Sequence, residues 1–137
     1  MINIKIKREK MNAVFTKHHL VGLPFDAVIH HFSEKDQHEH IHDHPFSFTT
    51  HILKGSYIER VYEILEDGTY KASIHHRKEG TTHLVTANTI HEIIELPDGE
   101  CFTLIRPNAK EKEPSFYRFE DGKIFKRQWN QRKFREV

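Results

Sequence analysis

Histidines recur at every second position in one short stretch of the chain, at His38, His40, His42 and His44. A β-strand points alternate side chains to one face, so these four imidazoles would line up together. Neutral imidazole is the commonest protein ligand for first-row transition metals, and two imidazoles spaced by two residues on a strand can share one ion. The stretch therefore predicts a metal site whose first ligands are histidines.

A third ligand has to come from elsewhere in the chain, and His91 is the candidate. It follows a small-residue turn and lies in an apolar run. The residues between His44 and His91 are enough for several strands, so these two side chains could face each other across a barrel. At about 3.3 Å per residue, His38 lies roughly 13 Å of strand from His42 and is expected at the rim. Whether His38 or His40 completes a four-histidine shell stays open.

The remaining histidines are poorer ligand candidates. Adjacent residues of a strand point to opposite faces, so the His-His doublets cannot chelate one ion. His51 has the wrong parity relative to His44 unless Pro45 marks a bulge. Asp43 alternates away from its two histidine neighbours, so we expect it to hold them in place rather than to bind the metal.

Short apolar and β-branched segments recur about every ten residues, each bounded by Gly, Pro, Asn or Asp. None of them has the length and period of a clear helix. The expected fold class is all-β, an antiparallel sandwich or barrel. Besides the histidine stretch, the expected strands are residues 27–32, 57–65, 69–76, 82–86, 89–96 and 101–107, followed by a hairpin over about 115–129.

The first 25 residues predict two successive elements. Ile2, Ile4 and Ile6 alternate with polar residues, as they would in a strand. Glu9 to Leu20 could then form a short helix before the break at residues 22–24.

Length and composition place the chain among single-domain globular proteins. Its 137 residues predict one domain over 1–137 with the barrel at about 28–106. Cys101 has no second cysteine to pair with, and we expect a packed thiol there. No N-terminal stretch has the pattern of a signal peptide, which favours the cytoplasm, and no apolar run approaches the roughly 20 residues that cross a bilayer. No membrane partner is expected.

Charge is unevenly distributed along the sequence. Residues 26–100 hold 6 Lys and Arg against 14 Asp and Glu, whereas the two flanks hold 15 against 6. The segment Lys123 to Arg135 is basic and aromatic, as in some nucleic-acid-binding proteins. Solvated strand faces look the same, however, and the acidic centre would repel phosphate. The sequence therefore argues against nucleic acid as a partner.

The histidine motifs resemble those of the cupins. A first cupin motif has two histidines two apart, usually a Glu, and then a Gly that ends the strand; a second has a Pro-x-Gly-x-x-His turn. His42, His44 and Gly55 stand at the first motif's positions, and residues 86–91, Thr-Ala-Asn-Thr-Ile-His, at the second's. The resemblance covers roughly residues 28–106. It implies a jelly-roll barrel, the cupin double-stranded β-helix, here with extra strands at both ends.

Two departures from the cupin motifs concern the ligand set. Phe48 or Thr49 stands where the metal-binding Glu would be, and Thr86 and Asn88 replace the Pro and Gly of the second turn. The chain is more similar to small, largely uncharacterised bacterial cupin-like proteins with a His-Asp-His-Pro-aromatic signature. The matching residues are His42 to Phe46, Gly55 to Glu59, Thr103-Leu104 and the hairpin that begins at Phe116.

These features predict a metal-dependent enzyme, oxygenase- or isomerase-like, acting on a small metabolite. His42, His44 and His91 would hold one divalent ion, Zn, Fe, Ni or Mn, and leave positions open for substrate. Glu59 is the candidate fourth ligand or general base, and Tyr57 a candidate acid or hydrogen-bond donor.

The alternative is a non-catalytic cupin that binds a small ligand or a metal as a sensor or accessory protein. Fold alone does not choose between these functions. Cupins often pair through edge strands, so a homodimer is expected. Four apolar side chains are expected to fill the barrel around the ion: Phe46, Phe48, Phe102 and Leu104.

Overall fold

A computed structural model describes residues 3–33 and 41–137, and every regular element in these residues is a β-strand. The prediction of an all-β chain is confirmed. The first sheet contains six strands in the order β1 (Lys5–Lys10), β2 (Phe15–Val21), β3 (Ala27–Phe32), β10 (Cys101–Pro107), β5 (Phe48–Gly55) and β8 (Thr82–Val85). The second contains seven, in the order β13 (Arg135–Glu136), β12 (Lys123–Gln128), β11 (Ser115–Glu120), β4 (Ile41–His42), β9 (Ile90–Glu95), β6 (Tyr57–Ile64) and β7 (Tyr70–Arg77).

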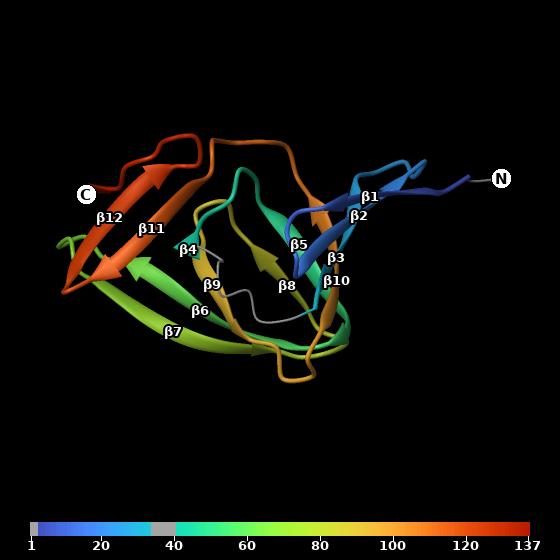
Figure 1. The fold of residues 1–137 in the computed structure, drawn as a ribbon, viewed down its shortest axis with the longest axis horizontal. Coiled ribbons are helices and arrows are strands. Elements are labelled where there is room, and N and C mark those ends of the chain that lie inside the picture. Colours follow the sequence, from blue (N-terminus) through green and yellow to red (C-terminus); the bar gives the residue numbers. More distant parts are fainter. Residues whose placement is uncertain (1–2, 34–40) are drawn as a thin grey trace.

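The two sheets curl around a shared interior, and all strand pairs are antiparallel (Figure 1). From β3 to β6, and again from β7 to β11, consecutive strands alternate between the sheets, so β5 and β6 belong to different sheets. Gly55 ends β5 with a positive φ of 78° and allows this sharp crossing. This is the jelly-roll arrangement that the cupin resemblance implies.

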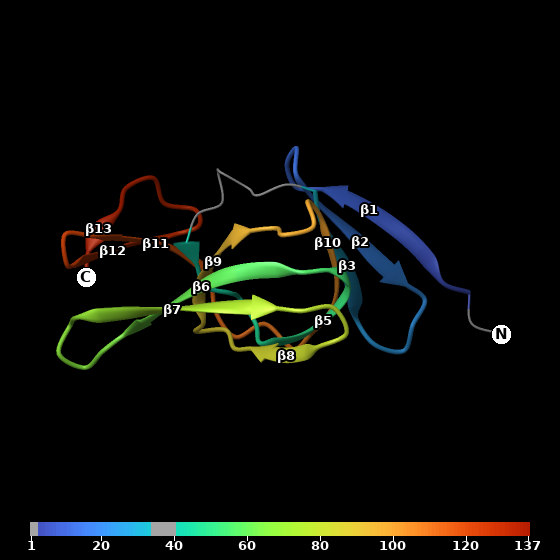
Figure 2. The same ribbon diagram turned by 90° about the horizontal axis from the view of Figure 1, so that it is seen from below.

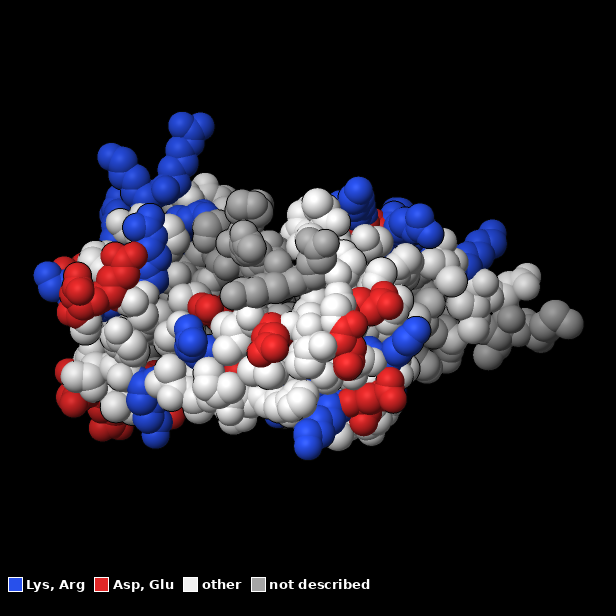
Figure 3. Space-filling view, turned by 60° about the horizontal axis from the view of Figure 1, so that its bottom comes forward, with Lys and Arg blue, Asp and Glu red and all other residues white. Residues whose placement is uncertain are grey.

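Both ends of the chain extend the sheets beyond the barrel. The N-terminal hairpin of β1 and β2 lengthens the first sheet, and the hairpin of β11 and β12 lengthens the second (Figure 2). The C-terminal hairpin agrees with the prediction for residues 115–129. Figure 3 shows Lys and Arg side chains projecting from the end that carries this hairpin and along the N-terminal strands.

The short helix proposed between Glu9 and Leu20 is wrong. These residues form the end of β1, a turn, and β2, which pairs over most of its length with β3. Val14, Phe15 and Thr16 favour a strand through their β-branched or aromatic side chains. Pairing with β3 makes this segment a strand, because β3 provides hydrogen-bond partners for the backbone groups of β2. The local sequence does not reveal this partner.

The buried core lies between the sheets and continues under the C-terminal hairpin. The central cluster packs Phe32 against Ile52, Tyr57, Ile93, Leu96 and Cys101. A second cluster contains Phe48, Val85 and Ile105, and a third contains Ile90, Tyr117 and Ile124. Cys101 is fully buried, in agreement with the packed thiol predicted from the sequence. No part of the described chain forms a helix long enough and apolar enough to cross a membrane.

Candidate metal centre

His42 and His91 lie directly opposite each other on neighbouring strands of the second sheet. β4 runs between β9 and β11, and its His42 is the register partner of His91. The expectation that the second motif would face the first across the barrel is therefore wrong. The two motifs are side by side, because β4 pairs with β9 on one edge and with β11 on the other within the second sheet.

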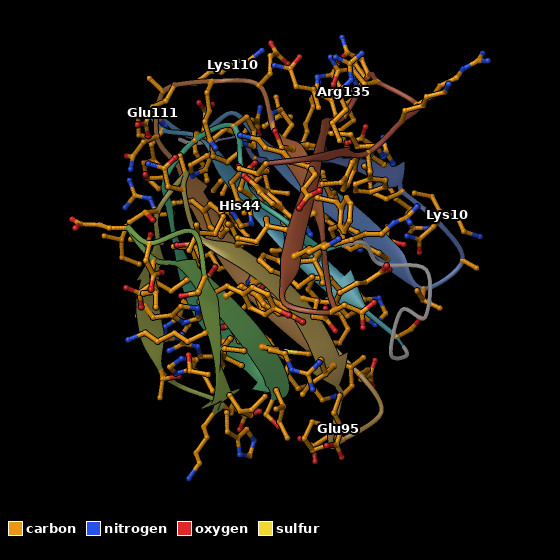
Figure 4. All side chains as sticks on the ribbon, turned by 90° about the vertical axis from the view of Figure 1, so that its left-hand side faces the viewer. Lys10, His44, Glu95, Lys110, Glu111 and Arg135 are labelled. Carbon is orange, nitrogen blue, oxygen red and sulfur yellow. The ribbon has the colours of Figure 1, made fainter. Side chains whose placement is uncertain are left out.

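His44 reaches the same point from the loop that follows β4. Its backbone N–H donates a hydrogen bond to the carbonyl of Ala87, 3.0 Å away, in the turn before β9. Its ring is buried, and its Nε2 lies 3.1 Å from the Nε2 of His91. Figure 4 shows His44 in the interior of the barrel, whereas the labelled Lys110 and Glu111 lie at the outer rim.

The three side chains His42, His44 and His91, the histidine triad, each offer a ring nitrogen, and these atoms lie within 4.8 Å of one another. An ion about 2 Å from each nitrogen holds neighbouring donors roughly 3 to 4 Å apart, which this spacing allows. Burial and the neighbouring imidazoles of His91 and His42 lower the pKa of His44 to about 2, so its imidazole stays neutral. The triad could hold one divalent transition-metal ion, as the sequence predicts.

Glu59 lies behind His91 rather than beside the triad nitrogens. Its Oε1 is 2.8 Å from Nδ1 of His91, and its Oε2 accepts a 2.7 Å hydrogen bond from Nε of Arg77. Burial raises the pKa of Glu59, but its hydrogen bonds to His91 and Arg77 and the charge of Arg77 outweigh this and lower the pKa to about 2. Because an ionised carboxylate only accepts, the His91 proton sits on Nδ1, and the Nε2 lone pair faces His44.

Tyr57 and His83 extend this network along the wall of the barrel. The Tyr57 hydroxyl lies 3.2 Å from Nε2 of His83, and that nitrogen lies 3.9 Å from Oε2 of Glu59. Burial, together with the charge of Arg77, lowers the pKa of His83 to about 4. Tyr57 also lines the cavity described next. Proton transfer by Glu59 or Tyr57 stays a prediction.

A cavity of about 980 Å³ opens in front of the triad. Phe46 and Phe48 line it as predicted, and the ring of Phe48 packs edge-on against His44 at 5.1 Å between centroids. The prediction that Phe102 and Leu104 fill the barrel is wrong. The inner positions of β10 are Cys101, Thr103 and Ile105, because the pairing of Cys101 with Gly55 sets the opposite parity, and Phe102 stacks on His31 instead.

Asp43 is buried and joins the triad segment to the C-terminal hairpin. Its Oδ1 accepts a 2.7 Å hydrogen bond from the Ser115 backbone N–H. Its Oδ2 accepts hydrogen bonds from the Tyr117 hydroxyl at 2.8 Å and the Lys112 ammonium at 2.5 Å. This agrees with the expectation that Asp43 holds its histidine neighbours in place.

Two other expectations concern histidines outside the triad. His51 is not part of the triad, as expected; it lies on β5 of the other sheet and contacts the Thr82 hydroxyl at 2.6 Å. His38 and His40 lie outside the described residues. Sequence reasoning missed three residues that contact the site: Arg77 on β7, the hairpin partner of β6, His83 on β8 of the other sheet, and Lys112 in the loop before β11.

Two antiparallel sheets curled around a cavity, with a histidine triad at its wall, define the cupin fold. Solved structures with this fold include hydroxypropylphosphonic acid epoxidase from S. wedmorenis, with a TM-score of 0.59 at 10% identity over 79% of this chain and 59% of that one. The E162A mutant of Bacillus subtilis oxalate decarboxylase OxdC gives 0.58 at 13% identity, over 79% and 29% of the two chains. An oxalate oxidase gives 0.52 at 16% identity, over 65% and 44%.

The chain spans less than two thirds of the length of each of these three structures. A scan of family models finds no match to the chain, and a search of curated proteins finds none. The similarity is therefore one of fold, and the chemistry has to be argued from the residues themselves.

Proposed function

We propose that this protein is a metal-dependent cupin enzyme, oxygenase- or isomerase-like, that acts on a small metabolite. The observation that carries the proposal is the meeting of three imidazoles, two of them with Nε2 atoms 3.1 Å apart, at the wall of a cavity of about 980 Å³. Three protein ligands leave positions open for water or substrate, whereas a structural site is closed by four. The fold neighbours named an epoxidase, an oxidase and a decarboxylase support this class of function.

The triad would hold Zn, Fe, Ni or Mn, and the bound ion would supply Lewis-acid or, as Fe, redox chemistry. One solved neighbour, the hydroxypropylphosphonic acid epoxidase, is described in its Fe(II) form. The rings of Phe46 and Phe48 line the cavity near the triad and make this part of its wall apolar.

Glu59 acts in this proposal as a positioning residue for His91. Its hydrogen bond to Nδ1 fixes the tautomer and ring orientation, and Arg77 fixes Glu59 in turn. Glu59→Gln keeps the shape but loses the charge, and we expect a loss in metal affinity of about 10- to 100-fold. The control is Glu63→Gln, because Glu63 is exposed and pairs only with Lys71 among the described residues.

The central experiment is elemental analysis of untagged protein, followed by titration of the metal-free protein with Zn, Fe(II), Ni and Mn. We expect one ion per chain, and we expect its loss in His42→Ala, His44→Ala and His91→Ala. His51→Ala should bind metal normally, because His51 points away from the triad. A protein that neither carries a metal nor binds one after chelation would refute the proposal.

Catalysis is tested separately on the metal-loaded protein with a panel of small metabolites, with and without oxygen. Turnover that disappears in His91→Ala would support the proposed enzyme function. Full metal loading with no turnover across the panel would favour the sensor or accessory function instead.

A further inference from the structure

A row of polar side chains crosses the wall formed by the first sheet. Lys17 on β2 is the register partner of His30 on β3, and His30 is the partner of Thr103 on β10. Directly opposed residues in neighbouring strands place their Cβ atoms about 5 Å apart. All three residues line the same cavity as the histidine triad, which belongs to the second sheet. We call these three residues the polar row.

The surroundings of the polar row are apolar. The ring of His30 packs edge-on against Phe15 at 5.0 Å and against Phe32 at 6.1 Å between centroids. Phe48 and Ile105 line the cavity as well. In ligand cavities, a few polar groups within a mainly apolar wall orient the bound molecule.

The His30 imidazole is a neutral hydrogen-bonding group. Burial, with the positive charges of Lys17 and His19, lowers its pKa to about 3. A neutral imidazole offers one N–H donor and one acceptor nitrogen. It is therefore able to donate a hydrogen bond to a ligand without carrying a charge of its own.

Thr103 lies at the other end of the polar row and is 1% exposed. Its hydroxyl is buried and has no hydrogen-bond partner among the described residues. An unpaired buried hydroxyl costs about 1 to 3 kcal/mol, so buried polar groups normally have partners. A ligand atom in the cavity would provide one.

Charge in the described lining of the cavity favours an anion at the polar row. Lys17 is the only Lys or Arg there, and its ammonium lies 5.9 Å from the centre of the Phe15 ring. Glu9 lies opposite Lys17 across β1 and β2, but it is exposed and its Oε1 contacts His19 at 2.9 Å. Of the two acidic residues in the lining, Asp26 is exposed and Asp43 is neutralised by Lys112.

We propose that Lys17, His30 and Thr103 form an anion subsite that binds the acidic oxygen group of a small organic ligand. The apolar part of the ligand would pack on the surrounding phenylalanine rings, and its other end would face the histidine triad. Only one part of this inference rests on the proposed function: the placement of the other end of the ligand at the histidine triad. The substrate class is thus a small acid with an apolar body, a carboxylate or a phosphate ester.

The test compares three ligands that share one ring: benzoate, phenyl phosphate and the neutral benzamide. Calorimetric titration uses the metal-free protein, so that no ion competes for the acid. We expect at least one of the two acids to bind about tenfold tighter than benzamide, since charge-assisted hydrogen bonds are the stronger ones. Benzoate and phenyl phosphate together show whether a carboxylate or a phosphate is preferred.

Variants assign the binding to the polar row. Lys17→Met should weaken acid binding about tenfold and leave benzamide binding unchanged. Lys54→Met is the matched control, because Lys54 is exposed on β5 and does not line the cavity. Thr103→Val keeps the side-chain shape and removes the unpaired hydroxyl, so it should keep the fold, as judged by thermal unfolding, while weakening acid binding.

Several results would overturn the subsite: no binding of any of the three ligands at millimolar concentration, equal binding of acid and amide, or acid binding that Lys17→Met leaves unchanged. Acid binding that appears only after metal loading and is unchanged in Lys17→Met would show that the acid binds at the metal-loaded triad instead. Metal content is measured independently, so a protein that binds benzoate through Lys17 but no metal would refute the proposed function and retain the subsite.

Discussion

The Nε2 atoms of His44 and His91 lie 3.1 Å apart, although the two residues are 47 positions apart in the sequence. Each imidazole is fixed by a separate part of the fold. The His44 backbone is bonded to the turn at Ala87, and the His91 ring to Glu59. The two nitrogens are therefore held close enough to share one ion.

Metal binding should stabilise the folded protein. An ion that binds only the folded chain adds about 2.7 kcal/mol to the free energy of unfolding at a free concentration of 100 Kd. We expect Zn²⁺ to raise Tm in the wild type and in His51→Ala, and to leave His44→Ala and His91→Ala unchanged. Differential scanning calorimetry of chelated and reloaded protein measures this, and an equal Zn²⁺ response in His91→Ala would count against the triad.

Removing the Asp43 carboxylate should loosen the C-terminal hairpin. Asp43→Ala leaves the buried Ser115 N–H and the Tyr117 hydroxyl without their acceptor. We expect a loss of about 2 to 4 kcal/mol in the free energy of unfolding, measured by urea denaturation. Asp67→Ala is the control, because Asp67 is exposed and caps only a local turn to Thr69, and it should cost less than about 1 kcal/mol. Similar losses in both variants would show that Asp43 has no special structural role.

Gly55 should tolerate no side chain. A Cβ at this position would lie 2.3 Å from the Glu100 carbonyl oxygen, and φ is +78°. We expect Gly55→Ala to cost more than about 2 kcal/mol, against roughly 1 kcal/mol for Gly68→Ala. Gly68 is a matched control, since its φ is +86° and a Cβ added there would meet nothing within 4 Å. Equal stability of the two variants in urea would contradict the close approach of β5 to Glu100.

The buried thiol of Cys101 should make the free energy of unfolding depend on pH in the alkaline range. Burial, with the negative charges of Asp98 and Glu79, raises the pKa of its thiol from 9.0 to about 12. Since the folded pKa lies above the unfolded value, the contribution to stability is complete below pH 9 and is lost as pH rises from 9 to 12. Within this window the wild type should lose up to about 1.4 kcal/mol per pH unit more than Cys101→Ala.

Urea denaturation of both proteins between about pH 8 and pH 11 measures this difference. The same burial should protect the thiol of the folded protein from iodoacetamide at about pH 8.5, with rapid alkylation after unfolding. Parallel pH profiles for the wild type and Cys101→Ala, or fast alkylation of the folded protein, would show that the thiol is accessible.

The strands from residue 27 onward follow from the sequence, because a period of two and the Gly- or Asp-containing turns are local signals. The same alternation predicted that Asp43 points away from its histidine neighbours. It does not relate His51 to His44, because the chain crosses from one sheet to the other between β4 and β5. The prediction was wrong for Phe102 and Leu104, because their large apolar side chains suggested that they fill the interior of the barrel. Pairing with β5 through Gly55 instead placed the smaller Cys101 and Thr103 inside.

By itself, the sequence determined which residues can bind a metal and that strands present His42 and His91, since residue chemistry and side-chain alternation are local properties. His44 lies in the loop after β4, which the alternation did not predict. Only the tertiary structure decided that His42 and His91 are neighbours in one sheet, that Glu59 holds His91, and that Lys17 lies beside His30. These relationships depend on the register between strands distant in sequence. Register is fixed by the packing of the whole barrel, which no single segment encodes.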